Sequence, residues 1–157
     1  MKAVFFDRDN TLIIDSHYMH DVKDLKFYPE TFSVLATLRD RGYKFFIISN
    51  QSGIGRGYFK QQQLDVFHQA MEQQFEQHNI FFEEIAYCPH APIDQCDCRK
   101  PSPKILLELI QRYGVDKENA YMVGDRDTDY QCGINAGIKA IKIHDGFELP
   151  NLLDLID

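Results

Sequence analysis

The sequence lacks any long apolar run and is short of basic side chains. Its 157 residues include 17 Lys and Arg against 24 Asp and Glu, which gives a formal net charge of −7. No apolar run approaches the ~20 residues that a membrane-spanning helix needs, so we expect no membrane partner. Contact with a nucleic-acid backbone requires a basic surface, and the acidic balance therefore argues against a nucleic-acid partner.

The sequence also lacks repeats, low-complexity tracts and a recognisable linker. We therefore expect residues 1–157 to form a single, monomeric domain, because this length is sufficient to bury a sizeable core. The opening residues "MKAVFF" lead directly into the charged "DRD", which leaves no apolar segment of the kind found in secretory signals. The expected compartment is the cytoplasm, where cysteines stay reduced.

Cysteine is scarce and unevenly distributed. Only four cysteines occur, yet three of them fall within residues 88–98, "CPHAPIDQCDC", together with a histidine. In a reducing compartment such a cluster favours metal binding over disulfides. The candidate ligands are Cys88, His90, Cys96 and Cys98. Three thiolates and one imidazole suit a closed, tetrahedral, structural Zn²⁺ site, which would also fix the following Arg99 and Lys100. A redox pair or chance clustering is the alternative.

Short apolar segments alternate with segments of helical periodicity along the chain. Strands are predicted at residues 2–6, 43–49, 83–88, 120–125 and 138–143. Helices are predicted at residues 29–41, 60–78, 101–114 and 128–137, with a short one near 148–156. Strands that alternate with helices indicate an α/β fold, in which a parallel sheet carries helices on both faces.

Polar clusters follow the predicted strands. "DRDNT" follows the first strand, "SNQSG" the second and "GDRDTD" the fourth, while the cysteine-rich loop follows the third. In parallel sheets the carboxyl ends of strands form the ligand site, so Asp7, Asp9, Asp125 and Asp129 should lie close together. A hard cation such as Mg²⁺ would relieve their repulsion and could hold a phosphate. Taken singly, these residues could equally be turn formers and helix caps.

Four of these segments together resemble a known family. "FFDRDNTL", "IISNQSG", "RKP" and "VGDRDTD" resemble, in order, the four motifs of the haloacid dehalogenase-like (HAD) phosphatases, and the similarity covers nearly the whole chain. The resemblance implies a Rossmann-like sheet. No long cap insertion is visible, so a nearly capless member is expected.

The resemblance implies a role for each matching residue. Asp7 would be the nucleophile that forms an aspartyl-phosphate, and Asp9 would be the general acid and base. Ser49 and Lys100 would bind the phosphoryl group. Mg²⁺ would be held by Asp7, the backbone carbonyl of Asp9 and Asp125, with support from Asp129. The family usually has glycine at position 10; because asparagine tolerates positive φ, we expect Asn10 to retain the local geometry.

The substrate is expected to be a small-molecule phosphate ester. Two groups of small, zinc-containing HAD phosphatases are similar to the chain, those acting on D-glycero-D-manno-heptose 1,7-bisphosphate and those acting on histidinol phosphate. "YMHDVKDLKFYPET" and "NQSGIGRGYF" resemble the first group, whereas the short cysteine loop and "GDRDTD" resemble the second. Arg56 could meet a second phosphate, which favours the bisphosphate.

The expected substrate contacts combine this resemblance with the position of the loops. They are Asp15, Ser16, His17, Tyr18, Asn50, Gln51, Ser52, Gly53, Arg56, Arg99 and Arg126. A third possibility is an inactive binding domain held together by a metal. The presence of both Asp7 and Asp9 argues against it, because a binding module has little need of the second carboxylate.

Overall fold

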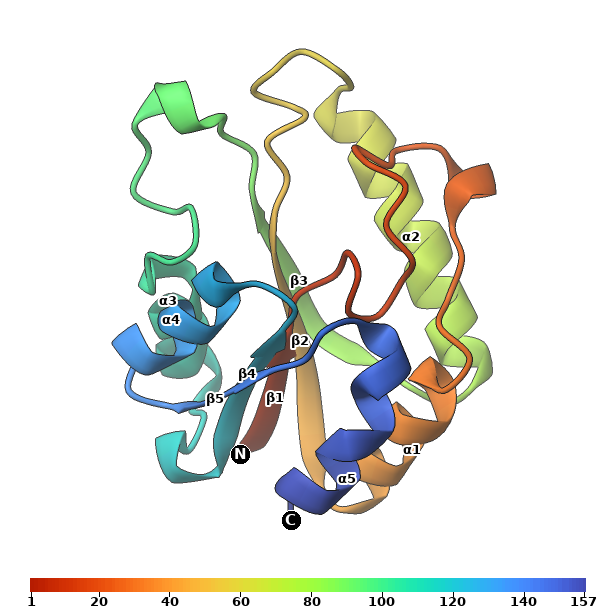
Figure 1. The fold of residues 1–157 in the computed structure, drawn as a ribbon, viewed down its shortest axis with the longest axis vertical. Coiled ribbons are helices and arrows are strands. Elements are labelled where there is room, and N and C mark those ends of the chain that lie inside the picture. Colours follow the sequence, from red (N-terminus) through yellow and green to blue (C-terminus); the bar gives the residue numbers. More distant parts are fainter.

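The computed structural model describes all 157 residues, which build a five-stranded parallel sheet between two layers of helices (Figure 1). The strands are β1 (Lys2–Phe6), β2 (Tyr43–Asn50), β3 (Phe82–Cys88), β4 (Ala120–Gly124) and β5 (Lys139–Lys142). Their order in the sheet is β3-β2-β1-β4-β5, and every neighbouring pair is parallel. The α/β fold with a parallel sheet is therefore confirmed.

Helices cover both faces of this sheet. The α-helices are α1 (Thr31–Asp40), α2 (Gln61–Gln77), α3 (Lys104–Tyr113), α4 (Asp127–Asn135) and α5 (Leu152–Leu155). Short 3-10 helices are η1 (Val22–Asp24), η2 (Pro92–Asp94), η3 (Lys117–Asn119) and η4 (Gly146–Asn151). Figure 1 shows α1, α2 and α5 on one face and α3 and α4 on the other. None of the helices is both long enough and apolar enough to cross a lipid bilayer.

The central strand β1 has apolar side chains on both faces, which is why helices cover both sides of the sheet. Val4 and Phe6 belong to the core on the α1 and α2 face, whereas Ala3 and Phe5 belong to the core on the α3 and α4 face. Successive side chains of a strand point to opposite faces, so a continuous apolar run marks a strand buried on both sides. The sequence "KAVFF" is such a run.

The amphipathic helix α2 follows the predicted pattern closely. Leu64, Phe67, Met71 and Phe75 are completely buried, and full burial of such side chains stabilises the fold by roughly 1.5–3 kcal/mol each. The glutamines of this helix lie mostly on its exposed side. Its core-facing stripe therefore fixes α2 against the sheet, where the ring of Phe75 packs against Phe82 of β3.

The bounds of two predicted helices differ most from those in the structure, whereas the other three differ by one or two residues at each end. The helix expected at 101–114 begins at Lys104, because Pro103 disfavours helical geometry for the preceding Ser102. The helix expected near 148–156 is divided into η4 and α5. Pro150 lies inside η4 and lacks the N–H that a continuous α-helix would need there.

The loops that leave the carboxyl ends of β1, β2 and β3 gather at one end of the sheet (Figure 1). They comprise residues 7–30, 51–60 and 89–103, and no additional sheet or helical domain covers them. This arrangement agrees with the expectation of a nearly capless fold. It also leaves the strand ends accessible from the side of these loops.

Candidate active site

Lys100 and two carboxylates form a buried cluster at the end of β1. Lys100 Nζ lies 2.8 Å from Asp7 Oδ1 and 2.7 Å from Asp129 Oδ1, and it also donates to the carbonyl of Ile48 at 2.7 Å. All three charged side chains are nearly inaccessible to solvent. Asp7 is fixed by its position, because its backbone N–H donates to the carbonyl of Val123 in the neighbouring strand β4. The sheet therefore places the predicted nucleophile and the predicted lysine together.

The charges in this cluster do not balance. Burial raises the pKa of Asp7 to about 8; Lys100 opposes the increase, whereas Asp129 and Asp9 add to it. Burial alone would lower the pKa of Lys100, but Asp7 and Asp129 raise it above its ordinary value, so the ammonium stays charged. One ammonium thus serves several carboxylates, and a further cation at this point would stabilise their ionised forms.

Asp125 extends the cluster and has a free ligand atom. Asp7, Asp125 and Asp129 each contribute one carboxylate oxygen to a group of three oxygens. These three oxygens lie within 4.8 Å of one another. Asp125 Oδ1 is buried without a hydrogen-bond partner, whereas Oδ2 accepts from Asn10 Nδ2 at 3.1 Å. A buried, unpartnered carboxylate oxygen is costly unless something binds it. These oxygens therefore suit a hard divalent cation such as Mg²⁺.

Asn10 adopts the backbone geometry that was expected of it. Its φ is +62°, in the left-handed region, as predicted for an asparagine in place of glycine. Its side chain is also occupied, because Tyr28 Oη donates to Asn10 Oδ1 at 2.7 Å while Asn10 Nδ2 donates to Asp125. Asparagine thus holds the orientation of Asp125, which glycine has no side chain to do.

Asp9 lies beside the cluster and reaches the solvent-accessible space. Its side chain is 24% exposed, and Oδ1 accepts from Arg8 Nε at 2.6 Å. Two adjoining cavities share Asp9, Asn50 and Arg126 in their walls. The smaller one reaches Asp7 and Lys100. Asp9 therefore stands between the predicted nucleophile and the larger cavity.

The larger cavity has a volume of about 200 Å³ and a strongly polar wall. It is lined by Asp9, Asp15, His17, Tyr18, Asn50, Gln51, Ser52, Arg56, Arg99 and Arg126. None of its three arginines pairs with a carboxylate, and Arg99 Nη1 is buried without any hydrogen-bond partner. In an acidic protein, three unpaired arginines around one cavity indicate an anionic ligand.

Three predicted contact residues do not line either cavity. Ser16 is exposed to solvent and is absent from the walls of both cavities. Gly53 packs against Phe59, whose ring occupies the space where a side chain would be. Ser49 is buried, and its Oγ accepts from Gln51 Nε2 at 2.6 Å. Ser49 therefore lies beneath the cavity wall, next to the residues that form it.

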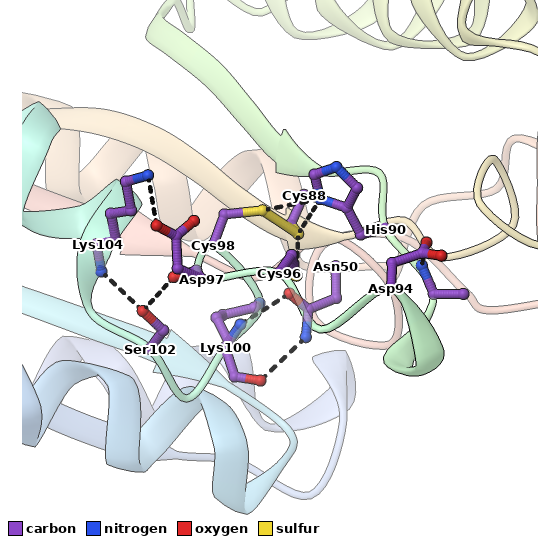
Figure 2. Close-up of a disulfide and its surroundings, with 11 residues drawn as sticks. Asn50, Cys88, His90, Asp94, Cys96, Asp97, Cys98, Lys100, Ser102 and Lys104 are labelled. Atoms are coloured by element: carbon purple, nitrogen blue, oxygen red, sulfur yellow. Dashed lines mark hydrogen bonds and ion pairs between the residues drawn. A yellow bond between two sulfur atoms is a disulfide. The ribbon is translucent and has the colours of Figure 1, made fainter.

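The candidate metal ligands of the 88–98 loop converge as the sequence predicts. Sγ of Cys88, Cys96 and Cys98 and Nδ1 of His90 all lie within 4.8 Å of one another (Figure 2). The sulfurs of Cys88 and Cys98 are joined as a disulfide, while Cys88 Sγ lies 3.5 Å from both Cys96 Sγ and His90 Nδ1. A disulfide accounts for only two of the four converging groups, whereas a bound metal would use all four.

This loop continues directly into Lys100, whose backbone is bonded to the end of β2, and it also contacts the loop that carries Arg56. Asn50 Oδ1 accepts from the Lys100 N–H at 3.0 Å, and Asn50 Nδ2 donates to the Lys100 carbonyl at 3.3 Å (Figure 2). The N–H of Gly55 donates to the carbonyl of Pro89 at 2.9 Å. The segment that includes the 88–98 loop and Lys100 is therefore bonded both to the end of β2 and to the loop that carries Arg56.

Sequence reasoning missed several residues of the site. Tyr28 orients Asn10, Thr128 lines the smaller cavity, and Arg8 pairs with Asp9. Arg8 is completely buried and also contacts His68 of α2. One signal was available, since a buried arginine inside "FFDRD" requires partners that the local sequence does not supply.

Two relatives are similar to this chain over most of its length. A D-glycero-beta-D-manno-heptose-1,7-bisphosphate 7-phosphatase from Haemophilus ducreyi is 39% identical over 145 residues, which cover 88% of this chain and 80% of that protein. The histidine biosynthesis bifunctional protein HisB of Blochmanniella floridana is 38% identical over 146 residues, which cover 91% of this chain but only 41% of that longer protein.

A solved structure and a family model also match nearly the whole chain. The crystal structure of the D,D-heptose 1,7-bisphosphate phosphatase from B. bronchiseptica, complexed with magnesium and phosphate, matches with a TM-score of 0.87 and 30% identity. That match covers 98% of this chain and 87% of the other. The model of the haloacid dehalogenase-like hydrolases matches residues 6–143. The chain therefore belongs to the haloacid dehalogenase-like hydrolase family.

Proposed function

We propose that this chain is a Mg²⁺-dependent phosphomonoesterase that removes the 7-phosphate of D-glycero-D-manno-heptose 1,7-bisphosphate. The observation that carries the proposal is the cavity with three unpaired arginines, Arg56, Arg99 and Arg126, which adjoins a buried carboxylate and lysine. Such a cavity attracts an anion, and the buried groups can act on its phosphorus.

In the first step, Asp7 attacks the phosphorus atom. A bond forms between an Asp7 carboxylate oxygen and phosphorus as the bond to the sugar oxygen breaks, and Asp9 gives its proton to that oxygen. Lys100, which lies 2.8 Å from Asp7 Oδ1, offsets the negative charge of the transferring group. Ser49 would assist through a hydrogen bond after a small rearrangement of its contact with Gln51.

In the second step, water attacks the aspartyl-phosphate. Asp9 takes a proton from the water, the bond between Asp7 and phosphorus breaks, and inorganic phosphate leaves. Asp9 is suited to both steps because it borders both cavities and is partly exposed. Asp7 is suited to the first because it lines the smaller cavity beside Lys100, whose charge favours the ionised carboxylate.

The residues that would hold Mg²⁺ are Asp7, Asp125 and the backbone carbonyl of Asp9, with Asp129 in support. The unpartnered Asp125 Oδ1 fits this role, and the match to a structure complexed with magnesium and phosphate supports it. When bound, the cation would supply charge neutralisation for the nucleophile and the phosphate. Gly124 leaves the room that Asp129 needs in this arrangement, because a side chain at position 124 would collide with Asp129.

For the 88–98 loop we propose a structural Zn²⁺ held by Cys88, His90, Cys96 and Cys98. Three sulfurs and one imidazole nitrogen form a donor set typical of closed zinc sites. Metal and disulfide exclude each other here, because zinc binds the thiolates. Cys96 and His90 lie close to the sulfurs of Cys88 and Cys98, which supports the metal-bound form. We propose the cytoplasm as the compartment, because its reducing conditions favour thiolates over a disulfide.

The substrate assignment depends on Arg56 as well as on the relatives. Arg56 is exposed at the cavity wall, and its Nε donates only to Ser52 Oγ at 3.2 Å. A second phosphate, remote from the reacting one, would give this guanidinium a charged partner. The cavity, the five strands and the cysteine loop all belong to one sheet and its connections, which supports treating residues 1–157 as one domain.

Histidinol phosphate is the second candidate. The likeness to HisB covers 91% of this chain, and Asp15 in the cavity wall could pair with the cationic amine of that substrate. This candidate leaves Arg56 without a charged partner, and we therefore rank it second.

The experiment that tests the proposal compares the two substrates with the same protein and Mg²⁺. We expect kcat/KM for the heptose bisphosphate to exceed that for histidinol phosphate. The reverse order would assign the chain to histidinol phosphate. No turnover of either substrate, nor of a generic aryl phosphate, would instead favour the inactive binding domain.

A further inference from the structure

His68 lies in the middle of α2 and is almost completely buried, with 5% of the residue exposed. Its ring nitrogen Nε2 lies 3.0 Å from Nη1 of Arg8, the residue between the two catalytic carboxylates. No step of the proposed reaction uses His68. A buried histidine in contact with a buried arginine therefore needs an explanation of its own.

The chemistry of this contact fixes the state of the ring. A guanidinium group has only donors, so Nε2 must accept the hydrogen bond and the ring proton must be on Nδ1. Burial, together with the charge of Arg8, also lowers the pKa of His68 to about 3. The ring is thus neutral and acts as a permanent acceptor for Arg8.

Arg8 has a partner for each of its three side-chain nitrogens. In addition to the bond with His68, Nε donates to Asp9 Oδ1 at 2.6 Å and Nη2 donates to Gln51 Oε1 at 3.3 Å. The guanidinium carbon lies 4.8 Å from the centre of the Phe67 ring. Because Arg8 is fully buried, these contacts leave its planar group no alternative position.

The same network reaches the other oxygen of Asp9. Gln51 Nε2 lies 3.4 Å from Asp9 Oδ2. One oxygen of the Asp9 carboxylate thus contacts Arg8, and the other contacts Gln51, which Arg8 holds through Nη2. We propose that His68 is a positioning residue, which fixes the Asp9 carboxylate through Arg8 in the orientation required for proton transfer. The inference rests on the proposed phosphatase activity and extends it to a residue on a different helix.

Loss of the Nε2 acceptor should therefore impair proton transfer in particular. Without it, Arg8 Nη1 is buried and unpaired, and the guanidinium can rotate away from Asp9. Formation of the aspartyl-phosphate needs a proton only when the leaving oxygen is strongly basic. An alkyl phosphate has such a leaving group, whereas 2,4-dinitrophenolate leaves without a proton.

The test uses the full chain with Mg²⁺ and two phosphate monoesters, 4-nitrobenzyl phosphate and 2,4-dinitrophenyl phosphate. In His68→Phe, which keeps a ring but no acceptor, the ratio of kcat/KM for the alkyl ester to that for the aryl ester should fall about 10-fold or more. This ratio is independent of the fraction of folded protein, because both esters are hydrolysed by the same active molecules.

Two further variants sharpen the test. His68→Gln places an amide oxygen where Nε2 was, so it should restore most of the ratio. His78→Phe makes the same replacement at the exposed end of α2, beside Phe32, and should leave the ratio at the wild-type value.

The outcomes separate this inference from the proposed function. An equal loss with both esters in His68→Phe, complete loss included, would assign His68 a purely structural role and overturn the inference. A ratio that stays low in His68→Gln would also overturn it. If the wild type hydrolyses no phosphate ester, the proposed function fails and the inference fails with it.

Discussion

The side chain of Asn50 brackets the backbone of Lys100, accepting from its N–H at 3.0 Å and donating to its carbonyl at 3.3 Å. Asn50 is the last residue of β2, and Lys100 follows the last cysteine of the 88–98 loop by two residues. The sheet thereby fixes the backbone from which Lys100, the proposed catalytic lysine, extends. The position of Lys100 Nζ depends on this pair as well as on its own ion pairs.

Asn50→Ala should consequently lower kcat by at least about tenfold, because small displacements of a catalytic group are costly. It should also lower the free energy of unfolding by about 1–3 kcal/mol, since Lys100 loses both hydrogen bonds. Steady-state kinetics and urea denaturation measure the two effects. The matched control is Asn135→Ala, because the exposed Asn135 donates to the carbonyl of Pro101, the residue after Lys100, and otherwise only accepts from Gln131 Nε2 of its own helix. Equal losses of kcat in both variants would show that the two hydrogen bonds between Asn50 and Lys100 are not what positions the lysine.

Asp7→Asn should abolish turnover while leaving the fold intact, because it removes the proposed nucleophile and changes little volume. It should also change how stability depends on pH. The pKa of Asp7 is raised in the folded protein from 3.8 to about 8. Between these values the folded form binds a proton at Asp7 and the unfolded form does not. The contribution of Asp7 to stability is therefore full below 3.8 and is lost as the pH rises toward 8.

The measurement is urea denaturation of metal-free wild type and Asp7→Asn between pH 4 and 8. The stability of the variant relative to the wild type should increase with pH across this window. A constant difference would mean that burial does not raise the pKa of this carboxyl in the folded protein. Near-wild-type turnover by Asp7→Asn would exclude the phosphoaspartate mechanism.

Much of this site could be predicted because its residues lie in short segments at strand ends. Asp7, Lys100 and Asp125 come together because parallel strands end at one edge of a sheet, which the alternation of strands and helices already implies. The positive φ of Asn10 could be predicted from its residue type. Local patterns were sufficient wherever the topology alone brings the segments together.

The contacts between distant side chains could not be predicted in the same way. His68 lies on the same stripe of α2 as Leu64 and Met71, so its burial could be inferred from periodicity. Its contact with Arg8, however, depends on how α2 docks against β1. The hydrogen bond from Tyr28 to Asn10 likewise depends on the path of a long irregular loop. Neither docking nor loop path is encoded in a local pattern.

The metal loop gives a prediction that distinguishes its two chemical states. Protein purified under reducing conditions without chelator should contain about one zinc per chain, and unfolding it with a chelator should release four titratable thiols. Cys98→Ser should lose zinc and activity, because the loop no longer holds Lys100. Cys132→Ser is the control, since Cys132 belongs to α4 and its thiol is not among the four converging ligand groups. A disulfide between Cys88 and Cys98 would leave only two thiols, and with no zinc bound it would exclude the metal site.

Gly55 connects the metal loop to the loop of Arg56, and this connection can be tested separately. A Cβ at position 55 would lie 2.5 Å from the backbone nitrogen of Ala91 and 3.0 Å from the carbonyl oxygen of Pro89. Gly55→Ala must therefore separate the two loops, at a cost of roughly 1–3 kcal/mol. We expect KM for the bisphosphate to rise while kcat for a small aryl phosphate changes little. An unchanged KM would show that the position of Arg56 does not depend on this contact.

Arg56 provides the sharpest test of the substrate. If it meets the phosphate that is not cleaved, Arg56→Ala removes a charge-assisted contact worth about 1.5–3 kcal/mol, which corresponds to a loss of about 10–150-fold in kcat/KM for the bisphosphate. Hydrolysis of a small monophosphate should hardly change, because that substrate has no group to place there. Lys60→Ala is the charge-matched control, since Lys60 ends the same loop but lines neither cavity.

The comparison of both variants with both substrates isolates the role of this guanidinium. A general effect of positive charge would lower kcat/KM equally in Arg56→Ala and Lys60→Ala. An effect on folding would lower it for both substrates in Arg56→Ala. Only a direct contact with the remote phosphate would produce a loss confined to one variant and one substrate. If the wild type prefers the bisphosphate and Arg56→Ala keeps that preference, another side chain of the cavity wall must bind the second phosphate, with Arg99 and Arg126 as the remaining unpaired arginines.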